Sequence, residues 1–180
     1  MKKILLVSAV SLSLLGCATM DRKAAEIVEA SSNPLKEYSE IVELKGVPKA
    51  KVFDASKQWM ARSFKSANNV IQYADAGTGT IIGKGNIKYP CQGFGDCLQY
   101  EKGIVNFTLT IDTKDDKAKV SFSDIGISVP TTVTGGVRFE AKEGVPVWEE
   151  APKKAVTEKL KAIIADYKSN VIKYQADNNW

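Results

Sequence analysis

Histidine is absent from this chain of 180 residues, and charge of either sign is not in large excess. Histidine is the commonest general base near neutral pH and a frequent metal ligand, so its absence disfavours nucleophile–base catalysis and metal coordination. The 25 basic and 21 acidic residues give a formal net charge of +4. That balance does not indicate nucleic acid as a partner. We therefore expect a protein that is not an enzyme and uses no cofactor.

Long apolar runs are also missing, with one exception at the start of the chain. Lys2 and Lys3 precede an apolar segment from Ile4 to Leu15 that only small residues interrupt. This layout is typical of a secretory signal, and the segment is short for a membrane-spanning helix. It ends in Leu14-Leu15-Gly16-Cys17, a small residue followed by a cysteine.

That ending resembles the lipobox of bacterial lipoproteins. The resemblance implies that residues 1–16 are a cleaved signal peptide and that the thiol of Cys17 carries a diacylglycerol, with palmitate among the acyl chains. Ala18 follows the cysteine, and by the same resemblance a residue other than Asp there favours the outer membrane. We expect an anchor on the periplasmic side of that membrane and a tether over residues 17–36. A short helix packed on the domain remains an alternative for the tether.

Only three cysteines occur, so lipidation of Cys17 leaves Cys91 and Cys97 as an isolated pair. In an exported protein such a pair predicts a disulfide. The closed loop either stabilises a loose connection or presents Phe94, Tyr89 and Tyr100 to a partner. A metal site is poorly supported, because two thiols without histidine leave zinc under-coordinated.

The remaining sequence predicts one α+β domain over residues 37–176. Val105, Phe107, Leu109 and Ile111 alternate with polar residues, which indicates a strand with one buried face. An apolar stripe that includes Trp59 predicts a helix over 50–66, and a second helix is expected over 150–176. The other strands are expected at 38–44, 70–73, 78–89 and 117–127. The pattern predicts a five-stranded curved antiparallel sheet backed by two helices, with 128–149 either a hairpin or a loop.

This β-α-β-β-β-β-α order resembles the TATA-binding-protein (TBP) fold. Residues 38–127 are also similar to a bacterial family of unknown function with a TBP-like fold. The similarity rests on Trp59, on the segments 79–85 and 105–111, and on the hairpin leading into 120–125. Family hairpins often carry glycine and then a basic-aromatic-arginine run, where this chain has Asp116, Lys117 and Lys119. The resemblance implies a fold and no activity.

A polar face is expected on the side of the sheet away from the helices. It carries lysines, amides and hydroxyls, with Asp112 as the one acid at its edge. It could bind an envelope protein, a glycan or an anionic ligand, although a solvated face without a ligand is the simpler interpretation. We expect a binding or adaptor lipoprotein of the cell envelope, with a structural component of an envelope complex as the alternative. The candidate binding face comprises Lys84, Asn86, Lys88, Asn106, Thr108, Thr110, Lys117 and Lys119.

Overall fold

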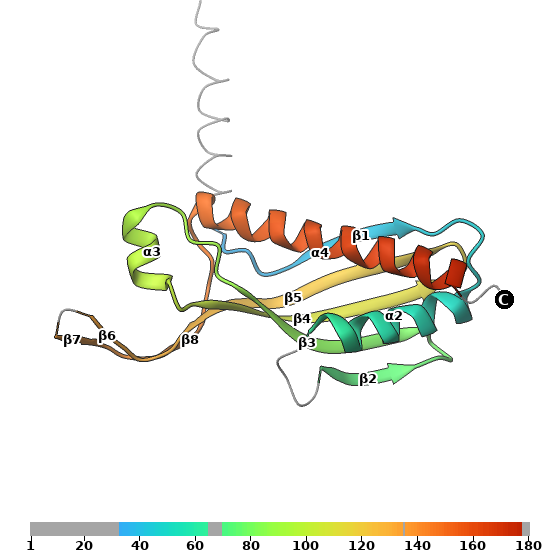
Figure 1. Ribbon diagram of the computed structural model, residues 1–180, viewed down its shortest axis with the longest axis horizontal. Helices are drawn as coiled ribbons and strands as arrows, with labels where there is room; N and C mark the ends of the chain where they lie inside the picture. Colours follow the sequence, from blue (N-terminus) through green and yellow to red (C-terminus); the bar gives the residue numbers. More distant parts are fainter. Residues whose placement is uncertain (1–32, 65–69, 135, 178–180) are drawn as a thin grey trace, which may run out of the picture. The chain divides into compact units, whose positions relative to one another are not determined.

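An antiparallel sheet in the strand order β1-β5-β4-β3-β2 organises the computed structural model (Figure 1). The structure describes residues 33–64, 70–134 and 136–177, so the signal peptide, Cys17 and most of the expected tether lie outside the described residues. The compact unit begins at Pro34, three residues before the expected start. Its elements are β1 (Tyr38–Glu43), α2 (Lys49–Ser63), β2 (Ile71–Asp75), β3 (Thr80–Lys88), α3 (Phe94–Tyr100), β4 (Ile104–Lys114), β5 (Lys117–Val129), β6 (Thr132–Thr134), β7 (Val137–Phe139), β8 (Lys142–Val145) and α4 (Glu150–Asp177).

Helices α2 and α4 run along the same face of this sheet (Figure 1). The apolar stripe of α2 is buried as expected, and Trp59 lies in the core, where its Nε1 donates a hydrogen bond to Asp166 Oδ2 of α4 at 2.7 Å. The two helices also meet through Ser56 and Tyr167, whose hydroxyl oxygens are 2.7 Å apart. Burial raises the pKa of Tyr167 to about 12, since an unsolvated phenolate is unfavourable there. Both polar groups are satisfied within the core.

Strand β4 confirms the predicted alternation. Its four apolar side chains, Val105, Phe107, Leu109 and Ile111, are buried under the helices. The polar residues between them face the other side of the sheet, which no described helix covers. This leaves one face of a half-buried antiparallel sheet free to contact solvent or a partner.

The α+β class and the TBP-like order of the main elements are as predicted, but the expected architecture was incomplete. A short helix, α3, begins between the two cysteines and continues past Cys97 to Tyr100. After β5 the chain forms a small β6–β7 hairpin, and β8 then pairs antiparallel with the end of β5. The open choice between a hairpin and a loop for 128–149 is therefore decided for the hairpin, with an additional edge strand.

The turn between β4 and β5 fixes the connection between β1 and α2. Asp116 has a φ of 64°, a left-handed conformation that aspartate tolerates better than most residues. Its carboxylate accepts a hydrogen bond from the Gly46 amide at 2.7 Å. The neighbouring Asp115 accepts one from the Lys49 amide at 2.7 Å, at the first residue of α2. Asp115 and Asp116 therefore both have structural partners. The carboxylate of Asp115 lies at the N-terminus of α2, where a negative charge is favourable.

Gly83 allows the segment before β2 to approach β3 closely. A Cβ atom at this position would lie 2.4 Å from the backbone oxygen of Val70 and 2.7 Å from Sδ of Met60. The same Val70 oxygen accepts the amide hydrogen of Lys84 at 2.9 Å, so it cannot withdraw without losing that bond. The absence of a side chain at Gly83 is therefore what permits this close approach.

Replacing Gly83 with alanine should lower the free energy of unfolding by about 1–3 kcal/mol, the usual cost of forcing an extra carbon into a packed site. Denaturant titration followed by circular dichroism measures this change. Gly95→Ala is the matched control, because a Cβ atom there meets nothing within 4 Å. Equal destabilisation by the two variants would show that β2 does not depend on this close approach.

Candidate functional site

The predicted polar face lies on β3, β4 and β5, away from the helices. Lys84 pairs across the strands with Thr108, and Asn86 with Asn106. Lys88 pairs with Ile104 at one end of β4, whereas Lys117 pairs with Lys114 at the other. These ends are ten residues apart, or about 33 Å along the strand. The eight residues therefore form a long surface and do not converge on one ligand-sized site.

An acid that was not predicted for this face reduces its positive charge. Asp124 lies within β5 at an irregularity where the strand pairing shifts by one residue. It has a φ of 53° and accepts a hydrogen bond from Thr108 Oγ1 at 2.7 Å. The expectation of a face whose one acid is Asp112 is therefore wrong.

Lys84 is already engaged by these neighbours. Its Nζ donates to Thr108 Oγ1 at 2.5 Å and lies 3.7 Å from Asp124 Oδ2. Both charged side chains are more than half exposed, so the ion pair itself contributes little to stability. For binding, however, it means that an incoming anion must compete with a carboxylate. The polar face is a weaker candidate site than its lysine content suggests.

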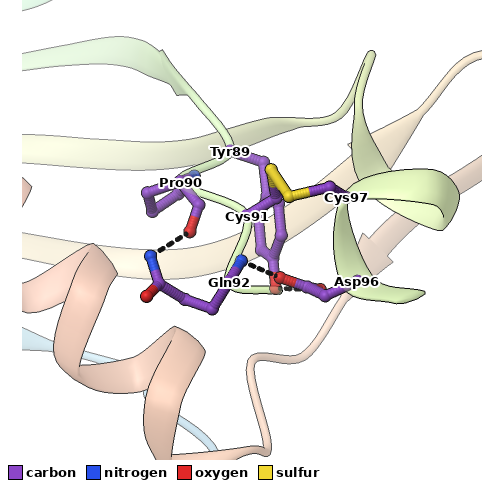
Figure 2. Close-up of a disulfide and its surroundings, with 6 residues drawn as sticks. All are labelled: Tyr89, Pro90, Cys91, Gln92, Asp96 and Cys97. Carbon is purple, nitrogen blue, oxygen red and sulfur yellow. Dashed lines mark hydrogen bonds between the residues drawn. A yellow bond between two sulfur atoms is a disulfide. The ribbon is translucent and has the colours of Figure 1, made fainter. Parts of the chain in front are cut away.

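The second candidate surface is the disulfide segment, residues 89–100, which contains Cys91, Cys97 and α3 (Figure 2). Cys91 and Cys97 are bonded, with their Cα atoms 4.9 Å apart. Within this loop the Asp96 carboxylate accepts hydrogen bonds from the hydroxyl of Tyr89, at 2.9 Å, and from the amide of Gln92. Burial, followed by the bond to Asp96, raises the pKa of Tyr89. The loop is therefore held by one covalent and two polar links at its base.

This arrangement decides which aromatic residues the segment presents. Tyr89 is buried, with its ring centroid 5.0 Å from that of Tyr100, so the expectation that it faces a partner is wrong. Phe94, in contrast, is 87% exposed at the start of α3. Leu98 lies one turn further along the same helix and is also exposed. The exposed apolar face of α3 is thus Phe94 and Leu98.

A pocket of about 580 Å³ lies between α3 and the strands that follow β5. Its volume is within the range of small-molecule sites, and such sites combine apolar walls with a few polar groups. One wall comes from the disulfide segment and the other from the end of β5 and from β6 to β8. The lining residues are Gly95, Leu98, Gln99, Tyr100, Val129, Thr132, Phe139, Glu140 and Lys142.

This pocket was not predicted from the sequence. The one local sequence feature that points to the pocket is the four-residue spacing of Phe94 and Leu98. This spacing places the two side chains one turn apart only if the segment is a helix. Phe139 lies within 128–149, the segment for which the sequence allows either a hairpin or a loop. Among the described residues, no group of three or more His, Cys, Asp or Glu side chains could hold a metal ion. No helix in the described ranges is long and apolar enough to cross a membrane.

Comparison with known proteins gives a family and a fold. The family described as "Domain of unknown function (DUF4468) with TBP-like fold" matches residues 38–128. The chain is similar to the crystal structure of a TBP-like protein from Parabacteroides distasonis, with a TM-score of 0.55 and 15% identity over 75% of this chain and 91% of that chain. A DUF4468 family protein from Bacteroides ovatus aligns with a TM-score of 0.40 and 16% identity over 78% of this chain and 80% of that one. At 15% identity the likeness to the Parabacteroides distasonis structure establishes the fold alone. No curated protein matches the chain.

Proposed function

The chain belongs to the family described as a domain of unknown function (DUF4468) with a TBP-like fold, and from its geometry we propose that the protein is a non-catalytic binding lipoprotein of the bacterial cell envelope. Its ligand site is the pocket between α3 and the β6–β8 segment. Two features support the envelope location. Cys17 lies in a lipobox-like context, and the disulfide is the kind of bond that persists in an oxidising compartment. The pocket is the observation that carries the binding function.

The lining of the pocket supports binding of an apolar or amphipathic molecule. Leu98, Val129 and Phe139 provide apolar surface, and the ring of Tyr100 adds to it. Glu140 and Lys142 stand at the same wall and could orient a polar end of the ligand. The lining residues include no serine, cysteine or histidine, so a Ser–His or Cys–His nucleophile–base pair is not formed there. This composition fits recognition better than catalysis.

The structural alternative is a scaffold role in an envelope complex. The feature that favours it is the β6–β7 hairpin, whose Val133 side chain is exposed although it is apolar. One exposed valine is common on protein surfaces, whereas a pocket with several apolar walls is not. We therefore place ligand binding first.

The probe N-phenylnaphthylamine, which fluoresces in apolar surroundings, tests the site. Replacing Leu98 with glutamate should raise its Kd by about 10-fold or more, because the variant loses apolar contact worth about 1.5–3 kcal/mol and places a charge in the wall. Ile41→Glu is the matched control, since Ile41 and Leu98 are both 64% exposed and Ile41 lies on the open side of β1.

The same Kd measurements distinguish the pocket from the polar face as the binding site. Lys84→Glu reverses a charge on the polar face and should leave the Kd of the probe unchanged. A Kd that is unaffected by Leu98→Glu would overturn the pocket assignment. A Kd that rises in Lys84→Glu or Ile41→Glu but not in Leu98→Glu would move the site to the polar face.

A further inference from the structure

The point where the chain enters the domain lies at the same end of the sheet as α3. The Leu35 amide donates a hydrogen bond to the backbone oxygen of Val147 at 2.9 Å, two residues beyond the end of β8. Val145 of β8 pairs with Ile127 of β5. In the next row of the sheet three residues lie side by side: Lys88 of β3, Ile104 of β4 and Ser128 of β5. Helix α3 connects β3 to β4. Figure 1 accordingly places α3 and the start of α4 at one end of the sheet.

This end also carries exposed apolar side chains, which we call the apolar tip: Phe94 and Leu98 on α3 and Phe139 on β7. All three are exposed, and Phe94 is the most exposed large apolar side chain that the structure describes. Trp148, the residue after the one that bonds to Leu35, is also half exposed. Trp, Phe and Leu are the side chains with which interfacial protein surfaces enter the boundary between lipid headgroups and acyl chains.

Charge around the apolar tip is balanced. The segments 87–102 and 129–145 contain four basic residues (Lys88, Lys102, Arg138, Lys142) and four acidic ones (Asp96, Glu101, Glu140, Glu143). A docking surface for a strongly charged partner would show an excess of one sign. The apolar tip instead matches a partner that is recognised through apolar contact.

We propose that the apolar tip docks on the bilayer that holds the lipid anchor, with Phe94 and Leu98 entering the boundary between headgroups and acyl chains. This inference rests on the proposed lipidation of Cys17. The 16 residues 18–33 separate that anchor from the domain. They span about 24 Å as a helix and a root-mean-square distance of about 20–25 Å as a random coil. In either case the entry end of the domain is held near the lipid surface.

Docking places the pocket at the membrane surface, because Leu98 and Phe139 belong both to its walls and to the apolar tip. An amphipathic molecule from the bilayer could then enter the pocket without crossing water. The ligand class that follows is a molecule with an acyl chain or comparable apolar group.

Depth-dependent fluorescence quenching tests the docking. Full-length lipidated protein carrying Phe94→Trp is reconstituted into phosphatidylcholine vesicles with or without bromine on the acyl chains. Trp148→Phe and Trp180→Phe remove the other reporters, and the buried Trp59 supplies a constant background. Brominated lipid should reduce the reporter fluorescence at least about twofold more than in the control, since interfacial side chains reach about 5–10 Å into the boundary.

The matched control is Tyr73→Trp in the same background. Tyr73 is also an exposed aromatic residue, and its partner Ile82 lies six residues before the tip end of β3, or about 20 Å along the strand. Equal quenching of the two reporters in protein whose mass includes the acyl chains would overturn the docking and leave the anchor intact. A mature protein without acyl chains would overturn both. Quenching of Phe94→Trp that requires anionic lipid would overturn the apolar mechanism.

Discussion

Replacing Cys17 with serine is expected to abolish incorporation of labelled palmitate completely. In the proposed lipoprotein the diacylglycerol is joined through the cysteine sulfur, and a serine hydroxyl is far less nucleophilic than a thiolate. The loss of label should be all-or-none because Cys17 is the one proposed acceptor of the diacylglycerol. Membrane anchoring should be lost with it, since each buried methylene of an acyl chain contributes about 0.8 kcal/mol. Metabolic labelling followed by mass determination of the mature protein measures it.

The other two cysteines provide the control for this experiment. A Cys91→Ser, Cys97→Ser variant lacks the disulfide but retains Cys17, and it should incorporate palmitate like the unmodified chain. Label that persists in Cys17→Ser would place the acyl group elsewhere. Wild-type protein that carries no label, or a mature chain that retains Met1, would contradict the lipoprotein assignment.

The parts of the fold that the sequence predicted well are those in which one residue pattern decides the structure. In β4 a period of two over Val105–Ile111 is matched by four buried side chains. In α2 the apolar stripe around Trp59 is matched by a helix with the same buried face. Burial of apolar area drives both, so the pattern carries the information.

The parts that were missed depend on contacts that no local pattern records. Helix α3 contains Gly95 and follows Gly93, whose φ is 84°, so its helix propensity is poor. It is held instead by the Cys91–Cys97 bond and by Asp96. Strand β8 has the sequence Lys-Glu-Gly-Val, which does not alternate, and it forms because β5 continues far enough to offer a partner.

The candidate site could be predicted only in part for the same reason. The alternation of β3 to β5 predicted which polar side chains share a face, but it could not predict the irregularity that brings Asp124 beside Lys84. The pocket was beyond prediction, because its walls are α3 and a segment about 40 residues later in the chain. Their proximity follows from the strand order, which places the ends of β3 and β5 on either side of β4.

Replacing Phe107 with alanine is expected to lower the free energy of unfolding by about 3–5 kcal/mol, the usual cost of removing a buried phenylalanine ring. Phe107 is 1% exposed and lies at the middle of the core. Its ring meets those of Phe64 and Phe122 edge to face, with centroids 5.9 Å and 5.1 Å away. The ring occupies the space above Gly85, where a Cβ atom would come within 2.6 Å of it. Denaturant unfolding followed by circular dichroism measures the loss.

The matched control for this variant is Phe94→Ala, which removes the same ring from an exposed position. It should change the free energy of unfolding by no more than about 0.5 kcal/mol, because its ring is 87% exposed in the folded domain. A loss below about 1 kcal/mol for Phe107→Ala would mean that the core can repack around the cavity. A loss of several kcal/mol for Phe94→Ala would mean that this ring stabilises the fold. Phe94 would then be a structural residue, and its exposure would no longer support docking of the apolar tip on the bilayer.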